Sequence, residues 1–330
     1  MAQAKKFTMS SSPHIAGKDT TQRIMLDVLI ALVPAVLAGT FFFGLYSLLL
    51  VALTTACCVG AEYLYCVLRG RKHTLWDLSA AVTGVLLALN FPPTAPLFFP
   101  VVGALIAIPL TKMLFGGIGK NFANPALTAR IVMFLAWGGL MSRFIAPINY
   151  SAGFSGFFNF SYFYSGADVV TSATPLNPNQ SVALLDLFVG RHAGVIGETS
   201  ALALIIGGIY LCIRRVIHPG LPLAVIASAA VFMLVFGTPL NAILPAVLSG
   251  GLMIGAIFMA TDYSSSPNTI LGTVIYAVLI GFLTAFFRKY AAMPEGVSFA
   301  ILLGNIIVPL LDRHLIPKPF GHVSAGRRVS

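Results

Sequence analysis

The residues best suited to chemistry form one polar stretch in an otherwise apolar chain, which reads DVVTSATPL beginning at Asp168. A threonine hydroxyl is a poor nucleophile at neutral pH unless a neighbouring group activates it. The small side chains of Ser172 and Ala173 leave room for a bulky donor, and Pro175 favours an extended backbone at Thr174. If a group is transferred from such a donor to the Thr174 hydroxyl, Asp168 could bind a metal ion or accept an orienting hydrogen bond during the reaction. We interpret Thr174 as the acceptor of a transferred group. The alternative is a solvated surface turn, because Ser, Thr and Asp favour turns.

This stretch resembles the recognition sequence of bacterial flavin transferases, which move FMN from FAD onto the last threonine of the motif through a phosphoester bond. The matching positions are Asp168, Thr171, Ser172, Ala173 and Thr174. The resemblance implies that Thr174 carries covalent FMN and that the other four residues form the flavinylation motif. It also implies a flavin transferase as a partner during maturation.

The composition excludes a soluble globular protein. Of the 330 residues, 58% are hydrophobic and 9% are charged, and the mean hydropathy is +0.91, whereas about a quarter of an ordinary soluble chain is charged. The net charge of +10 does not indicate nucleic-acid binding, because the basic residues lie in short clusters between apolar runs. Four cysteines within apolar segments are interpreted as packing residues. The chain is therefore expected to be an all-α polytopic protein of the lipid bilayer.

Apolar runs of roughly membrane-spanning length organise the chain into two sets of five. We expect about ten transmembrane helices, at residues 24–43, 45–68, 75–90, 96–115, 125–141, 199–213, 221–237, 241–260, 269–287 and 297–311. The resulting organisation is a cytoplasmic segment (1–23), a first membrane repeat (24–141), an extracytoplasmic loop with the motif (142–198), a second membrane repeat (199–311) and a cytoplasmic tail (312–330).

The basic clusters predict the orientation of the chain, since Lys and Arg concentrate in cytoplasmic loops. Lys5, Lys6 and Arg23 precede the first run and Arg69 follows the second, which places both termini in the cytoplasm. Five crossings then place the loop that carries the motif outside the membrane. The pair at 288–289, Arg and Lys, falls on the outer side and disagrees with this orientation.

An internal echo suggests that the two sets are inverted repeats. Thr83–Asn90 resembles Ser249–Ala256, and an odd number of spans in each half inverts the second copy. Broken helices are expected at the interface between the repeats. Gly116–Ala126 contains glycines and a proline that an uninterrupted helix does not tolerate, and Met293–Gly296 is its expected counterpart. Unwound backbone at membrane depth must be satisfied by protein or by a watery cavity, so these turns are expected to line a site.

Further motifs identify the chain as similar to the RnfD/NqrB family. The N-terminal Ser12-Pro13-His14 resembles the start of the RnfD branch, and the Gly-rich segment ending at Asn124-Pro125 resembles the family's Asn-Pro break. The resemblance implies a subunit of the Rnf complex, an ion-translocating ferredoxin:NAD oxidoreductase of the bacterial inner membrane. That complex couples electron flow to Na⁺ or H⁺ translocation. No stand-alone catalysis is expected of this chain.

The same resemblance implies cofactors and partners. Besides covalent FMN, it suggests a second, noncovalent flavin such as riboflavin, which the sequence does not locate. The implied partners are other Rnf subunits, notably RnfG, which also carries FMN, and the membrane subunits RnfA and RnfE.

Ionisable residues inside apolar runs are costly and are candidates for function. They are Asp27, Glu62, Asp77, Arg130, Asp262 and Glu295. Most of them lie near a predicted helix end, where a cap or a side chain reaching to the interface explains them. Asp27 and Arg130 are the better candidates for an ion path, although nothing in the sequence pairs them. The histidines lack metal-binding spacing, and no metal site is predicted.

A competing hypothesis follows from the architecture alone. An inverted repeat of five spans with broken helices also suits a channel or transporter for a small polar solute, resembling the urea transporters. Such a protein would have no use for the Thr174 motif. The choice between the two functions must be made at the site and not from the fold.

Overall fold

The computed structural model describes residues 20–70, 74–148, 183–291 and 296–315, and within these ranges the regular secondary structure is helical, without a β-strand. The helices are α1 (Thr21–Phe43), α2 (Leu45–Leu68), η1 (Leu75–Asp77), α3 (Ser79–Leu89), α4 (Phe98–Leu105), η2 (Ile106–Met113), α5 (Pro125–Ala136), α6 (Gly138–Met141), α7 (Leu184–Val189), α8 (Ala201–Ile213), α9 (Gly220–Val235), α10 (Leu240–Leu248), α11 (Leu252–Ile254), η6 (Gly255–Met259), α12 (Ile270–Tyr290) and α13 (Val297–His314).

Each predicted apolar run contains a helix, but few of these helices are full spans. Among the described residues, four helices are long and apolar enough to cross a membrane, namely α1, α2, α12 and α13, and a bent pair makes a possible fifth. The others are shorter. For example, α3 has 11 residues and α5 has 12, against about 20 for a complete span. The chain is a multi-pass membrane protein built from long helices and shorter apolar ones.

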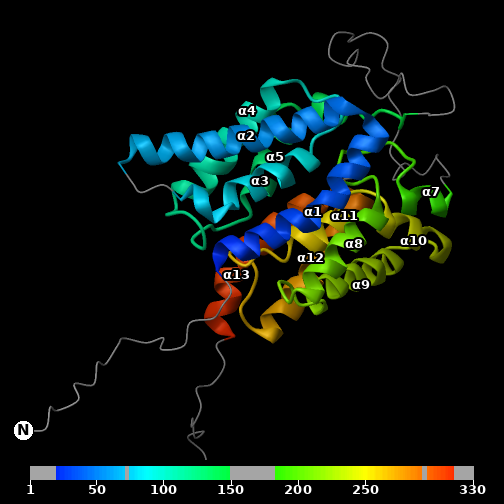
Figure 1. The fold of residues 1–330 in the computed structure, drawn as a ribbon. Helices are drawn as coiled ribbons and strands as arrows, with labels where there is room; N and C mark the ends of the chain where they lie inside the picture. The colour runs from blue at the N-terminus through cyan, green and yellow to red at the C-terminus, as the bar shows by residue number, and fades with distance from the viewer. Residues whose placement is uncertain (1–19, 71–73, 149–182, 292–295, 316–330) are drawn as a thin grey trace, which may run out of the picture.

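The helices form two groups with α1 between them. Figure 1 shows α2, α3, α4 and α5 on one side, and α8 to α12 on the other. α13 packs against α12 and is counted with the second group. α1 packs against α2 and α3 in the first group and against α8 in the second, while α5 contacts α13. The interface between the two groups is therefore where residues far apart in the sequence meet.

Small residues bring the helices of each group close together. A Cβ atom added at Gly84 in α3 would lie only 2.6 Å from the Cα atom of Thr55 in α2. Gly207 in α8 lies in the same way against the backbone of Ala31 in α1. Close backbone approach through small residues is the usual packing mode in membranes, where apolar side chains gain little by leaving lipid.

The predicted break at Gly116–Ala126 is confirmed. Gly116, Gly117 and Gly119 all have positive φ angles, which residues with a side chain rarely adopt. α5 then starts with Pro125 at its first position, and the Asn124 side chain caps it by accepting a hydrogen bond of 3.0 Å from the amide of Ala126. The expected counterpart lies almost wholly in residues 292–295, outside the described residues.

The run at 241–260 is not the single straight helix that we expected. It divides into α10 and the α11–η6 segment, which meet at an angle of 66° across Ser249–Gly251. Gly250 has a φ of +69°, so a glycine turn produces the bend. Arg288 in α12 donates hydrogen bonds to the carbonyl oxygens of Ala246 (2.6 Å) and Ser249 (3.1 Å) at the end of α10. This role explains a basic residue that disagreed with the predicted orientation.

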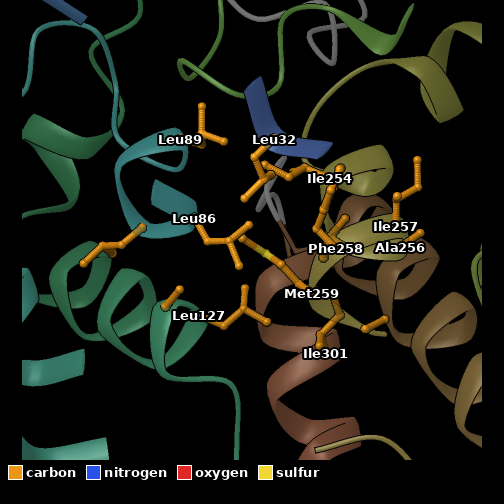
Figure 2. Close-up of a cluster of buried hydrophobic side chains, with 14 of the residues drawn as sticks. Leu32, Leu86, Leu89, Leu127, Ile254, Ala256, Ile257, Phe258, Met259 and Ile301 are labelled. Atoms are coloured by element: carbon orange, nitrogen blue, oxygen red, sulfur yellow. The ribbon is translucent and has the colours of Figure 1, made fainter. Parts of the chain in front are cut away.

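Both groups contribute to the apolar core at their interface. Figure 2 shows Leu86 and Leu127 from the first group beside Met259 and Ile301 from the second. All four side chains are buried, and Met259 lies in η6, which has the wide turns of a π-helix. The centre of the interface is thus packed with apolar side chains.

Candidate functional site

The flavinylation motif lies outside the described residues, since Asp168, Thr171, Ser172, Ala173 and Thr174 all belong to residues 149–182. The two ends of that segment are described. On the N-terminal side, the amide of Ile148 donates a 2.8 Å hydrogen bond to the carbonyl of Phe42, near the end of α1. On the C-terminal side, α7 follows and packs against α8 and α10. The segment therefore leaves the helices close to the C-terminal end of α1.

A large pocket lies at the opposite, N-terminal end of α1. Its volume is about 670 Å³, and both helix groups line it. The lining residues are Thr21, Ile24, Met25, Val28, Ser79, Val82, Thr83, Leu86, Lys112, Ile118, Gly119, Asn121, Asn124, Pro125, Leu211, Val216, Ile217, Phe258, Thr261, Asp262, Tyr263, Ser264, Ser266, Asn268, Val308, Pro309 and Asp312. The Gly-rich break thus lines a cavity, as the sequence predicted.

One part of the pocket wall is apolar and another is rich in hydrogen-bonding groups. Val82, Leu86 and Phe258 form apolar surface, and all three also belong to the apolar core. Asn121 and Asn124 come from the break before α5 and supply amide groups. A wall of this kind suits a mostly apolar ligand whose edge carries polar atoms.

Two carboxylates of the pocket wall, Asp262 and Asp312, are held by hydrogen bonds. Asp262 accepts from the hydroxyl groups of Ser264 (2.9 Å) and Ser265 (3.1 Å). Asp312 accepts from the backbone amide of Asn268 (3.0 Å) and from its side chain (2.9 Å). Asp262 lies in the loop between η6 and α12, and burial raises the pKa of its carboxyl above the ordinary value, while the bonds from the serines lower it.

A buried ion pair stands behind another part of the wall. Lys112 in η2 donates hydrogen bonds of 2.7 Å to Glu62 Oε2 in α2 and 2.7 Å to Ser79 Oγ in α3. The Lys112 and Glu62 side chains are only 3% and 1% exposed, and Thr74 donates a further hydrogen bond to the Glu62 carboxylate. Lys112 and Ser79 line the pocket, whereas Glu62 does not.

Arg130, a candidate for an ion path, joins three distant parts of the chain. Its Nη1 atom donates to Asn90 Oδ1 after α3 (2.6 Å) and to Ser298 Oγ in α13 (2.8 Å). Its Nη2 atom pairs with Glu198 Oε1 at 3.1 Å, and both charged side chains are buried. Arg130 does not line the pocket. The guanidinium links the two helix groups.

Asp27, the other ion-path candidate, also forms an ion pair between the groups. Its carboxylate in α1 lies 3.1 Å from Arg214 Nη2 just after α8, and it accepts a 3.0 Å hydrogen bond from Tyr210. This pair shares no residue with the Arg130 pair, so the structure does not bring the two candidates into one cluster.

The remaining ionisable candidates have different surroundings. Glu62 lies inside α2 and not near a helix end, Asp77 lies in η1, and Glu295 is outside the described residues. Two ionisable residues of the site were missed. Lys112 stood in the fourth apolar run, where any charge is a functional candidate, and Glu198 lay in the predicted extracytoplasmic loop, where a charge is ordinary.

Comparisons with known proteins agree with the motifs. The family model described as NQR2, RnfD, RnfE matches residues 8–321. The D subunit of the Na(+)-translocating ferredoxin:NAD(+) oxidoreductase complex of Acetobacterium woodii is 41% identical over 326 residues, covering 96% of this chain and 95% of that protein.

Two further relatives have similar coverage. The D subunit of the proton-translocating ferredoxin:NAD(+) oxidoreductase complex of Clostridium ljungdahlii is 35% identical, covering 97% of this chain and 98% of that protein. The D subunit of the ion-translocating oxidoreductase complex of Yersinia pseudotuberculosis is 34% identical, covering 97% and 99%.

Proposed function

This chain belongs to the NQR2, RnfD, RnfE family, and from that premise we propose that it is the electron-carrying membrane protein RnfD, the D subunit of an ion-translocating ferredoxin:NAD oxidoreductase complex. The observation that carries the proposal is the 41% identity to a relative with that name along 96% of the chain. The relatives' names indicate a complex of several subunits, so other subunits are partners. RnfG, RnfA and RnfE are the partners that the family implies.

Covalent FMN on Thr174 is the first cofactor of this proposal, and its support is the sequence motif. The described ends of the 149–182 segment add a constraint. Thr174 lies nine residues before Ala183, which precedes α7. At most about 3.3–3.6 Å per residue, the threonine stays within roughly 30 Å of that end. Gly190 at the end of α7 lies against Phe42 near the C-terminal end of α1, so the proposal places the flavin on that side of the molecule.

A second, noncovalent flavin is proposed in the pocket at the N-terminal end of α1. The space of about 670 Å³ falls within the usual range of about 300–1,000 Å³ for small-molecule sites. Leu86 and Phe258 supply apolar surface for a ring system, and Asn121, Asn124 and Ser79 supply groups for its polar edge. When bound there, the flavin supplies the redox chemistry, and the chain supplies orientation, exclusion of water and nearby charge.

The two proposed flavin sites lie at opposite ends of one membrane-spanning helix. α1 has 23 residues, which at 1.5 Å per residue gives about 34 Å, close to the thickness of the hydrocarbon core. Flavins at the two faces of the membrane suit a protein that, together with its partner subunits, transfers electrons from one face to the other. The tether on Thr174 would keep one carrier at high local concentration, so that transfer does not wait for diffusion.

We further propose that the two helix groups are inverted repeats. α2 packs against α3 and α4 in the first group, and α9 packs correspondingly against η6 and α12 in the second. α1 contacts α8, and α5 contacts α13, across the interface. In this arrangement both termini are cytoplasmic, Thr174 is extracytoplasmic, and the pocket opens towards the cytoplasm.

The competing function as a channel for a small polar solute requires a water-filled path between the two groups. Among the described residues, the interface instead contains a packed apolar core that includes Leu86 and Met259 (Figure 2). Arg130 then bridges the groups through Ser298 and Glu198. These contacts favour the redox function over passive conduction.

Purification of the tagged chain from its native membrane in mild detergent tests the assignment. We expect the other subunits to co-purify and the preparation to reduce NAD with reduced ferredoxin. Deletion of the chain should abolish this activity in membranes, and the chain supplied from a plasmid should restore it. A chain that purifies alone, with unchanged membrane activity after its deletion, would overturn the assignment.

A further inference from the structure

Lys112 is unusual among the residues of the pocket wall. Of the described lining residues it is the one with a basic side chain, while Asp262 and Asp312 are the acidic ones. Lysine is rarely buried unless it has a partner, and here the side chain is only 3% exposed. A buried lysine facing a cavity therefore calls for a physical explanation.

Stability alone does not explain it. Replacing a buried ion pair by well-packed apolar residues is often neutral or stabilising, because taking two charges out of water costs more than their attraction returns. The surroundings of the Lys112–Glu62 pair would accommodate apolar residues, since α2, α3 and η2 are otherwise largely apolar. The ion pair gives the pocket wall an oriented dipole, which apolar residues in its place would not provide.

One N–H group of the Lys112 ammonium is not used in the hydrogen bonds to Glu62 and Ser79. A lysine ammonium has three N–H groups. Two of them bond to Glu62 Oε2 and Ser79 Oγ, both at 2.7 Å. Within the described part of the chain the third has no protein acceptor. An acceptor on a ligand in the pocket would complete the set.

The local backbone brings this lysine to the wall. Ile106–Met113 has the wide turns of a π-helix and contains Pro109, which has no amide to donate. Wide turns of this type often occur at functional sites, because they rotate the following side chains away from the face that an α-helix would give them. η6 in the second group has the same geometry and supplies Phe258 to the same pocket.

The Lys112–Glu62 ion pair is oriented with respect to the pocket. Lys112 lines the pocket, while Glu62 lies behind it and is additionally held by Thr74. The positive end of the pair therefore faces the ligand, and the negative end is further away. In a buried site such an arrangement produces a larger potential than it would in water.

We propose that Lys112 binds the acceptor edge of the ligand in this pocket and stabilises the negative charge that the ligand gains on reduction, and that Glu62 moderates this effect from behind. The ligand class is a planar heteroaromatic ring system with carbonyl or ring-nitrogen acceptors, and under the function proposed above it is the noncovalent flavin. When such a ring takes up one electron, which a reduced redox centre of a partner subunit would supply, without taking up a proton, it gains one negative charge. Lys112 contacts the ligand directly, and Glu62 is a positioning residue that acts through Lys112.

The test uses the full-length chain in detergent with Thr174→Ala, so that any remaining flavin is noncovalent. Flavin released by denaturation is counted by chromatography with fluorescence detection, and the midpoint potential of the bound flavin is measured by dithionite titration. Lys112→Met should shift the potential to a more negative value, and Glu62→Gln to a more positive one. Lys112→Arg, which keeps the charge, should leave the potential close to that of the parent.

Two controls separate these effects from damage to the fold. The double variant E62Q/K112M removes both charges and so leaves no buried carboxylate without its cation, and thermal unfolding shows whether it folds. Glu198→Gln alters an equally buried ion pair that does not line the pocket, and it should leave the potential close to that of the parent.

The outcomes distinguish this inference from the function on which it rests. A parent chain without releasable flavin would overturn the flavin assignment of the pocket. A parent chain with flavin whose potential is the same in Lys112→Met and Glu62→Gln, or moves in the same direction in both, would overturn the role of Lys112 alone. A more negative potential in Lys112→Met together with a more positive one in Glu62→Gln supports it, because a merely structural pair would not produce this order, and the reversed order would overturn it.

Discussion

Arg130 shows how one side chain can join segments that are distant in the sequence. Its guanidinium reaches Asn90, Glu198 and Ser298, which belong to three different parts of the chain. A planar group with several fixed donors suits this task, and a lysine ammonium at the same place could not reproduce the geometry. We therefore assign Arg130 to the assembly of the two helix groups.

Replacement of Arg130 should destabilise the protein strongly. Arg130→Gln removes the cation beside the buried Glu198 carboxylate, and loss of one partner of a buried pair costs about 3–5 kcal/mol. The melting temperature in detergent should fall clearly, and the double variant R130Q/E198Q should recover part of the loss because it removes the isolated charge as well. Equal melting temperatures for the single variant and the parent would contradict this assignment.

His192 predicts how stability depends on pH. It lies buried in the segment between α7 and α8, and burial lowers its pKa from 6.5 to about 4, against the opposing effect of Asp186. Between these two pH values the unfolded chain binds a proton that the folded chain does not. Stability should therefore rise with pH from about 4 to 6.5, by up to about 1.4 kcal/mol per pH unit from this group.

Thermal unfolding of the parent and of His192→Gln across this pH range measures the effect. The variant should show a smaller slope between pH 4 and 6.5 than the parent, and the two curves should run parallel above pH 7. Identical slopes in the acid range would show that His192 does not contribute to the pH dependence.

Among the elements, the close packing of α2 and α3 depends on a missing side chain. A Cβ atom at Gly84 would meet the backbone of Thr55 at 2.6 Å, whereas nothing lies within 4 Å of the corresponding position at Gly60 in α2. Gly84→Ala should therefore destabilise the chain by about 1–3 kcal/mol through overpacking. Gly60→Ala should be neutral or stabilising by up to about 1 kcal/mol, because alanine favours helices. The melting temperatures of the two variants, measured under the same conditions, test this prediction. Equal changes in both variants would argue against the close approach of α2 and α3 at Gly84.

The sequence predicted the helical segments better than their lengths. Apolar runs located a helix in each expected place, and the glycines with Asn124-Pro125 predicted the break before α5, because both signals are local. The bend at Ser249–Gly251 was missed since hydropathy continues across it. The short lengths of helices such as α3 and α5 depend on packing between the groups, which a run of apolar residues does not encode.

The candidate site was predictable to a lesser degree. Asp27 and Arg130 could be identified as buried charges, but their partners Arg214 and Glu198 lie 187 and 68 positions away. Such distant pairings follow from the fold and cannot be inferred from spacing. Lys112 was overlooked although a charge in an apolar run was the available signal.

Across the whole molecule, α1 connects the two regions that the proposed function needs. The pocket lies at its N-terminal end, and the segment that contains Thr174 leaves near its C-terminal end. Figure 1 shows this helix lying between the two helix groups. The proposed electron carriers would therefore lie at opposite ends of α1.

The most direct test of the central proposal is the intact mass of the purified chain, made in a host with an active flavin transferase, together with flavin fluorescence in a denaturing gel. We expect the added mass of one FMN ester and a fluorescent band. Both should disappear in Thr174→Ala and persist in Ser181→Ala, which removes a hydroxyl outside the motif. An unmodified chain from a host that flavinylates other proteins, or a fluorescent Thr174→Ala chain, would contradict the assignment of Thr174 as the flavin carrier.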